Sequence, residues 1–308
     1  MSYTGPEFHS PQQRRFRRAP LAVGLAALVP GALLGWVVYE GVGRPGGSSG
    51  ASNAGQADAA TPKSAAAVPG DDAKVPTASP SAARPLQGKV VVIDPGHNPG
   101  NFQHTSEINQ KVDIGTNWKE CDTTGTSTNA GYSEARFSLD VAHRLRTLLE
   151  KQGATVKLTH DGDQPAWGPC VTKRAEIGNA AHADAAISIH ADGAPEGDRG
   201  FHVILPASVH AGAADTRPIV DSSRTLGEHV ESDFAKVTGS APSNYVGNGT
   251  GLDVRKDLGG LNLSTVPKVF IECGNMRDSK DAALLTSGAW RQKAAQGIAD
   301  GIADFLGK

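Results

Sequence analysis

The chain has 308 residues, of which 38% are hydrophobic, and its 30 basic and 32 acidic residues give a formal net charge of −2. This length and composition allow one substantial core. The nearly balanced charge excludes both the basic surface of a nucleic-acid-binding protein and an acidic solvating tail. We therefore expect no nucleic-acid partner, and we expect a monomer.

The N-terminal part has the pattern of a membrane anchor. Residues 1–20 contain four clustered arginines, and residues 21–39 read "LAVGLAALVPGALLGWVVY" without a charge. As a helix this run would span about 28 Å, close to the thickness of a bilayer core. The arginines favour a cytoplasmic segment 1–20, a transmembrane signal anchor at 21–39 and an exported remainder. A cleaved signal peptide, with "ASNA" at 51–54 as the cleavage site, is the alternative.

Residues 40–84 are dominated by Ala, Gly, Ser, Pro and Asp and contain no aromatic residue. Such a composition predicts a disordered linker, because it offers no apolar face to bury. We assign the remaining residues, 85–308, to one folded domain.

In that domain, short β-branched runs alternate with helical patterns, which indicates an α/β fold with a largely parallel sheet flanked by helices. The expected strands are Lys89–Asp94, Thr155–His160, Asp184–His190, Gly200–Pro206 and Val266–Glu272. The expected helices are Glu134–Gln152, Val171–Ala181, Pro218–Lys236 and Ala289–Leu306. The strand "GFHVILP" alternates less cleanly, which favours an antiparallel strand near an edge.

Three residues that bind metals or carry protons follow or end these strands. His97 follows the first strand in "VVVIDPGHNPGN", His190 ends the third, and Glu272 ends the last. Ligands of open α/β sheets collect at the carboxyl ends of the strands. We therefore expect these three side chains to lie along one edge of the sheet.

The first helix brings a fourth such residue to the same edge. The positions Glu134, Ser138, Val141, Leu145 and Leu148 follow the spacing of one helix face, and the apolar members should face the sheet. Glu134 then points inward, where a carboxylate needs a partner. Its presence in the first turn also suits the helix dipole, with Ser133 as the N-cap.

Two imidazoles and a carboxylate form a three-ligand set that leaves a position open for water, as catalytic zinc sites do. We predict that His97, Glu134 and His190 bind zinc and that Glu272 acts as the general base and acid. Non-haem iron oxygenases use the same ligand set, but on a different kind of fold.

Four segments in this order, "VVVIDPGHNPGN", "GYSE", "AAISIHADG" and "VFIECGNMRD", resemble the zinc-dependent N-acetylmuramoyl-L-alanine amidases of bacterial cell walls, in particular the actinobacterial, mycobacterial type. The resemblance covers residues 85–308. It implies the same zinc ligands and the same catalytic glutamate, Glu272. It also implies hydrolysis of the amide between N-acetylmuramic acid and L-alanine, with peptidoglycan or muropeptides as substrates.

Two other functions remain open at this stage. A zinc peptidase that cuts within the stem peptide would use the same site. A catalytically silent, membrane-tethered wall-binding protein is the second alternative, although retention of all four site residues argues against it. Among further residues, Arg174, Arg199, Arg255 and Asn275 are candidates for contacts with an anionic stem peptide, and Asp94 is a candidate for orienting the His97 turn.

The three cysteines of this exported chain leave one unpaired. Cys273 lies at a buried strand end, pointing away from Glu272, and is expected to be a small buried hydrophobic residue rather than a fourth zinc ligand. Cys121 and Cys170 lie in polar loops that leave the sheet at its carboxyl edge. We therefore predict a Cys121–Cys170 disulfide, which would hold the insertion at 98–132 beside the site.

The anchor assignment gives the first testable prediction. A reporter enzyme fused after Lys308 should be active outside the cytoplasm, because the arginines before the apolar run keep the N-terminus inside. The measurement uses two fusions, one to a reporter that works only in the cytoplasm and one to a reporter that works only outside it. Activity of the cytoplasmic reporter alone would contradict the assignment.

Overall fold

A computed structural model of the protein describes residues 84–307. The expected cytoplasmic segment, the signal anchor and all but the last residue of the linker lie outside these residues. Among residues 84–307, no helix has the length and apolar character needed to cross a membrane.

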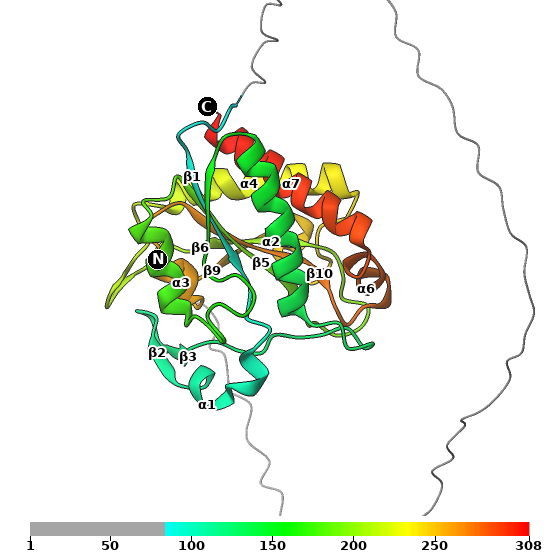
Figure 1. The fold of residues 1–308 in the computed structure, drawn as a ribbon, viewed down its shortest axis with the longest axis horizontal. Helices are drawn as coiled ribbons and strands as arrows, with labels where there is room; N and C mark the ends of the chain where they lie inside the picture. The colour runs from blue at the N-terminus through cyan, green and yellow to red at the C-terminus, as the bar shows by residue number, and fades with distance from the viewer. Residues whose placement is uncertain (1–83, 308) are drawn as a thin grey trace, which may run out of the picture. The chain divides into compact units, whose positions relative to one another are not determined.

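The centre of the domain is one six-stranded sheet (Figure 1). Its strand order is β4 (Thr155–Leu158), β1 (Val90–Pro95), β5 (Ala185–Asp192), β10 (Lys268–Asn275), β6 (His202–Pro206) and β9 (Leu252–Arg255). All neighbouring strands are parallel except β10 and β6, which are antiparallel. The expected largely parallel α/β sheet is confirmed, and so is the antiparallel strand near one edge.

Helices cover both faces of this sheet. On one face lie α2 (Glu134–Lys151), which crosses in front of the strands in Figure 1, α4 (Val220–Thr238) and α7 (Gly288–Leu306). On the other lie α3 (Val171–Ala180) and the short α5 (Gly259–Asn262). Successive side chains of a strand point to opposite faces. Val269, Ile271 and Cys273 accordingly pack into the larger core, whereas Phe270 packs with α5.

Helix α2 carries its buried stripe as expected, with one shift. Glu134, Ser138, Val141 and Leu145 are buried, but Leu149 rather than Leu148 completes the stripe, because 3.6 residues per turn bring position 149 under the helix. Ser133 is the N-cap residue, yet its side chain accepts no capping hydrogen bond.

Shorter elements lacked a clear pattern in the sequence. Between β1 and α2 lie the 3-10 helix η1 (Asn101–Gln103), α1 (Thr105–Ile108) and the hairpin of β2 (Lys111–Asp113) and β3 (Trp118–Glu120). Further along are β7 (His210–Ala211), β8 (Ala214–Asp215), η2 (Gly247–Gly249), β9 and α6 (Ser279–Leu285). Segments of two to seven residues are too short to show a period.

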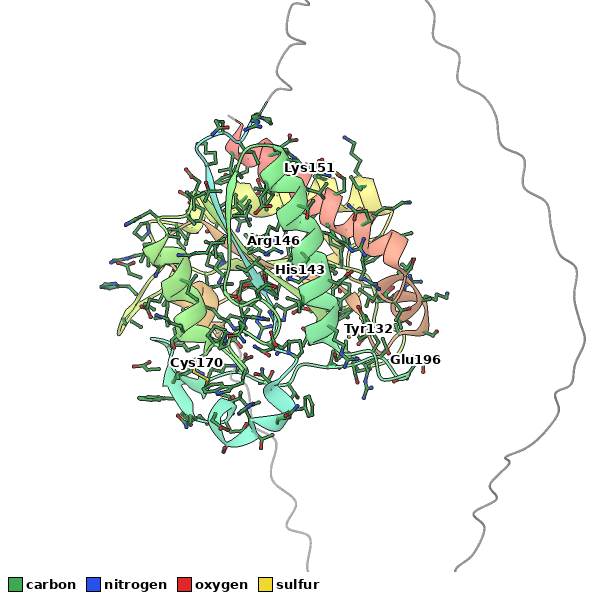
Figure 2. The ribbon with its side chains drawn as sticks, viewed as in Figure 1. Tyr132, His143, Arg146, Lys151, Cys170 and Glu196 are labelled. Carbon is green, nitrogen blue, oxygen red and sulfur yellow. A yellow bond between two sulfur atoms is a disulfide. The ribbon has the colours of Figure 1, made fainter. Side chains whose placement is uncertain are left out.

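The predicted disulfide is confirmed. Cys121 and Cys170 are bonded, 49 residues apart in sequence, and Figure 2 draws the bond in yellow beside Cys170. The backbone adds a second link there, because the Val171 amide donates to the Cys121 carbonyl at 2.7 Å. The loop after β3 is thus fixed to the start of α3. Cys273 is a free, buried cysteine, as expected.

The disulfide leads to a stability prediction. Closing a loop of about 50 residues is worth about 4 kcal/mol in the chain-entropy model. The Cys121→Ser, Cys170→Ser double variant should therefore lose about 3–4 kcal/mol of unfolding free energy in urea titrations. The wild-type protein after reduction should show the same loss. Equal stability of the oxidised, reduced and double-variant proteins would contradict this prediction.

Candidate metal centre and active site

The four candidate site residues meet at the carboxyl edge of the sheet, where the sequence predicted them. His97 follows β1, His190 lies in β5, and Glu272 in β10 stands directly beside His190 in the strand register. Glu134 is the first residue of α2, which begins at the same edge. His97 has a φ of 61°, in the left-handed region that non-glycine residues rarely enter, and such strain is typical of functional sites.

Three of these residues bring ligand atoms together. One nitrogen of each histidine and one carboxylate oxygen of Glu134 lie within 4.8 Å of one another. Glu134 Oε1 is 3.1 Å from His97 Nε2 and 2.8 Å from His190 Nδ1. The other carboxylate oxygen, Oε2, accepts a hydrogen bond of 2.9 Å from the Thr126 amide. The group His97, Glu134 and His190 is therefore able to hold a metal ion.

Neighbouring groups fix the orientation of this set. His97 Nδ1 lies 3.1 Å from the carbonyl oxygen of Thr123, so a proton on Nδ1 leaves Nε2 free to face the metal position. Gly96 and Gly125 leave the space that the rings occupy. A Cβ on Gly96 would come within 2.4 Å of the His190 ring, and one on Gly125 within 2.7 Å of the His97 ring.

The charges of the set favour a cation. Burial alone would lower the pKa of His97, but the Glu134 and Asp122 carboxylates together outweigh burial and raise that pKa to about 10. Burial opposes ionisation of Glu134 as well, yet His97 and His190 hold the pKa of Glu134 well below its ordinary value. Glu134 is thus ionised where the ligand atoms meet, and in the absence of another cation a proton on His97 balances its charge.

Glu272 occupies a different environment from Glu134. Its Oε2 atom is buried and has no hydrogen-bond partner within residues 84–307. Burial, and then repulsion by Glu134 and Asp192, raise the pKa of Glu272 well above its ordinary value. Arg255 opposes that shift and lines the same hollow as Glu272. An unpartnered carboxyl group of raised pKa is suited to moving a proton.

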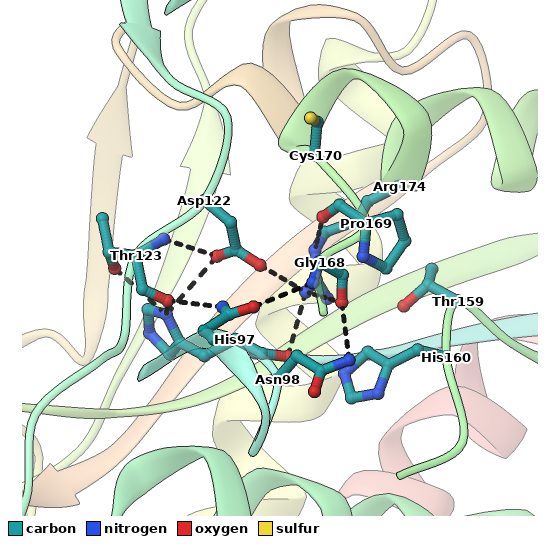
Figure 3. A network of polar contacts seen from close by, with 12 residues as sticks. His97, Asn98, Asp122, Thr123, Thr159, His160, Gly168, Pro169, Cys170 and Arg174 are labelled. Atoms are coloured by element: carbon teal, nitrogen blue, oxygen red, sulfur yellow. Dashed lines mark hydrogen bonds and ion pairs between the residues drawn. The ribbon is translucent and has the colours of Figure 1, made fainter. Parts of the chain in front are cut away.

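Beneath His97 lies a buried network of ions centred on Arg174 (Figure 3). Its guanidinium is 2.8 Å from both Asp94 and Asp122, and it donates to the His97 carbonyl at 2.9 Å. Burial alone would raise the pKa of Asp94, but Lys268 and Arg174 hold that pKa well below its ordinary value. The charged state of this network therefore supports the turn that presents His97.

This network corrects one set of expectations. Arg174 and Asn275 were candidates for contact with the stem peptide, but both are buried, with 4% and 0% of their surface exposed. Asn275 donates to the carbonyls of Ala194, Pro195 and Asp198 in the loop after β5, and its Oδ1 accepts from the Arg277 amide. Arg199 is paired with Asp281 and Arg255 with Asp257, and Arg255 also lines the hollow that contains Glu272.

Several residues of the site were missed by the sequence analysis. Asp122 lies 3.6 Å from His97 Nδ1, and Tyr245 donates to Asp192 at 2.8 Å beside the hollow of Glu272. His202 stands opposite Glu272 on β6, is buried, and packs edge-on against Tyr245. No sequence motif marks these residues, because the register of β6 and the folding of two long loops bring them to the site.

A second group in the described residues has ligand-type atoms within 4.8 Å of one another: His229, Asp233 and Asp304. It lies on α4 and α7, far in sequence from the edge motifs, and Asp304 is exposed. Nothing else at this group indicates a ligand.

The hollow over the metal position, about 350 Å³, is lined by all four site residues. It shares His97, His190 and Phe270 with a smaller cavity of about 220 Å³ under the β2–β3 hairpin. It also shares Gly125 and Thr126 with an open groove of about 520 Å³. A substrate that reaches the metal position therefore has room on two sides.

Comparisons with known proteins show the family to which the chain belongs. The family described as N-acetylmuramoyl-L-alanine amidase (Amidase_3) matches residues 91–304. The N-acetylmuramoyl-L-alanine amidase Rv3717 of Mycobacterium tuberculosis is 39% identical over 76% of this chain and 94% of that protein.

Two solved structures are similar over the same region. Ami1 from Mycobacterium smegmatis, an N-acetylmuramyl-L-alanine amidase, is 38% identical with a TM-score of 0.65, covering 72% of this chain and 98% of that one. The apo form of Ami1 from Mycobacterium abscessus is 39% identical with a TM-score of 0.64, covering 72% and 100%. The chain therefore belongs to the Amidase_3 family, the N-acetylmuramoyl-L-alanine amidases that hydrolyse peptidoglycan.

Proposed function

We propose that this amidase works with one zinc ion held by His97, Glu134 and His190, and that Glu272 carries the proton in hydrolysis of the amide between N-acetylmuramic acid and L-alanine. The proposal rests on one observation, that the carboxylates of Glu134 and Glu272 lie in different environments. Glu134 lies ionised between two imidazoles, whereas Glu272 keeps an unpartnered buried oxygen and a raised pKa.

The residues present fit zinc. Two imidazole nitrogens and one carboxylate oxygen are the donor types of catalytic zinc sites, and three protein ligands leave a position open. Cys273, which would close the site as a fourth ligand, points into the core on the other face of the sheet. When bound, zinc polarises a carbonyl and lowers the pKa of a water molecule towards 7.

The protein's own residues supply the remaining chemistry. Glu272 accepts a proton as water attacks the lactyl carbonyl carbon, and it returns the proton to the nitrogen of L-alanine as the C–N bond breaks. A positive ion beside Glu272 would favour its ionised, proton-accepting form and so counter the shift that burial causes. The products are a lactyl carboxylate and a free L-alanine amine.

Two alternatives are less well supported. A zinc peptidase that cuts within the stem peptide would need the same residues, but the matching family and relatives are described as cleaving at L-alanine. A catalytically silent wall-binding protein would not need Glu134 and Glu272 to have pKa values shifted in opposite directions. No observation among the described residues favours either alternative.

A cell-wall amidase acts outside the cytoplasm. For this chain we add that residues 1–20 remain in the cytoplasm, 21–39 anchor it in the membrane, 40–84 tether it, and 85–308 form the catalytic domain. The apolar run at 21–39 supports the anchor. We also propose a monomer, because in residues 84–307 Phe102, Trp118 and Val254 are the large hydrophobic side chains left exposed.

The zinc assignment predicts about one zinc per chain in metal analysis, with loss of activity on chelation and recovery when zinc is returned. His190→Ala should lose both the metal and the activity, since two ligands hold zinc weakly. His229→Ala, in the second group of possible ligands, is the matched control and should keep both. Iron at full occupancy, or zinc lost from the His229→Ala protein, would contradict the assignment.

The role of Glu272 predicts a specific defect. Glu272→Gln should keep zinc at the wild-type level but lose at least about a hundredfold in turnover, because the amide cannot accept the proton. The measurement combines metal analysis with the release of L-alanine amines from a muramyl peptide. Glu228→Gln, an exposed change on α4, controls for the loss of a negative charge. Turnover within a few fold of wild type would remove Glu272 from the mechanism.

A further inference from the structure

The open groove beside the metal centre is lined by two arginines that the proposed chemistry does not use. It begins at Gly125 and Thr126, which also line the hollow over Glu134 and Glu272. It then runs past the start of α2 to Arg136 and Arg277. A substrate bound at the metal position can extend directly into this groove, since the two spaces share a wall.

The arginines of this groove are unusual in this protein. Within residues 84–307, every arginine except Arg84, Arg136 and Arg277 has a carboxylate oxygen within 4.0 Å, and two of these exceptions line the groove. The chain has more acidic than basic residues. Acidic residues are therefore numerous enough to pair with the arginines, yet Arg136 and Arg277 have no carboxylate within 4.0 Å among the described residues.

The groove itself offers no negative charge. Among the described residues that line it there is no aspartate or glutamate. Apart from the two arginines, the lining residues are small, polar or apolar, and Phe102 is the largest of them. Both arginines are exposed. Two guanidinium groups thus face an acid-free hollow of about 520 Å³.

Arg277 is also held in place. It follows β10, and its Nη1 atom donates to the Ser127 carbonyl at 3.3 Å and to Asn129 at 3.2 Å. Its Nε and Nη2 atoms have no partner within residues 84–307 and stay available to a ligand. Arg136 makes no side-chain hydrogen bond to the described residues, so its N–H groups are available to the same ligand. Two guanidinium groups with unpaired N–H donors suit a carboxylate ligand.

We propose that Arg136 and Arg277 form a subsite for a free carboxylate of the stem peptide beyond L-alanine, so that the enzyme prefers acidic over amidated stems. The inference rests on the amidase function and deepens it. On the glycan side of the scissile bond, the carboxyl group of the muramic acid is consumed in the amide and leaves no charge. The peptide side carries the free carboxylates. A cationic, acid-free groove therefore fits the peptide and sets its direction across the metal centre.

The size of the effect follows from the exposure of both arginines. An exposed ion pair contributes up to about 1 kcal/mol, which is about fivefold in binding. Two independent contacts would give about twenty-five-fold, and two arginines that share one carboxylate should give less than that. The preference should appear in KM more than in kcat, because the groove lies away from the reacting bond and holds substrate and transition state equally.

The experiment uses the full chain and two synthetic muramyl peptides that differ only in whether the peptide carboxyl groups are free acids or carboxamides. Wild type should cleave the free acid with a KM that is lower by between about fivefold and about twenty-five-fold. The Arg136→Gln, Arg277→Gln double variant should lose this preference by raising KM for the acid alone. Arg224→Gln, at an exposed arginine of α4 that pairs with Glu228, is the control and should keep the preference. Equal KM values in wild type, or an equal loss on both substrates in the double variant, would overturn the proposal.

A binding measurement separates this proposal from the catalytic one. The two peptides without the muramyl group are titrated into the Glu272→Gln protein and its double-arginine derivative, and affinity is read by calorimetry. Preference for the acid that disappears with the arginines supports the subsite whatever the turnover of Glu272→Gln. Equal affinity for acid and amide overturns it, whereas normal turnover of Glu272→Gln counts against the catalytic assignment alone.

Discussion

The geometry of the active site depends on one buried guanidinium. Arg174 binds Asp94 at the end of β1, Asp122 in the loop after β3, and the carbonyl of His97 between them. The segment of Asp94 and His97, the loop of Asp122 and the helix of Arg174 are far apart in sequence, and these contacts hold all three together. A buried ion network adds little net stability compared with apolar packing, but removing one partner leaves charges unpaired at a cost of about 3–5 kcal/mol. We infer that the network is important for the position of His97 more than for overall stability.

Around that support, the sheet brings the remaining groups together. β5 and β10 are neighbours in register, so His190 and Glu272 stand side by side, and α2 begins at the same edge with Glu134. The Cys121–Cys170 disulfide joins the loop that contains Asp122 to the start of α3, which carries Arg174. The covalent link and the ion network therefore act on the same two segments. An exported enzyme can use such a bond, because the compartment is oxidising.

The sequence was informative where a short pattern had a structural consequence. A buried strand followed by His97, and a glutamate in phase with an apolar stripe, were sufficient to predict which side chains meet at the sheet edge. The role of Arg174 could not be predicted in this way. Its position in a helix does not show that the side chain reaches the end of β1, or that it pairs there with Asp94 and Asp122. His202 and Tyr245 depend on the register of an antiparallel strand and on a loop without periodicity. The two groove arginines are recognisable only by the absence of acidic neighbours in space.

All of these features serve one reaction, the hydrolysis of the amide between N-acetylmuramic acid and L-alanine. The most direct measurement is digestion of purified peptidoglycan followed by mass spectrometry of the new ends. We expect muramic acid with a free lactyl carboxylate, together with peptides that begin with a free L-alanine amine. New amino termini at a later residue of the stem peptide, with the muramyl–alanine amide intact, would contradict it.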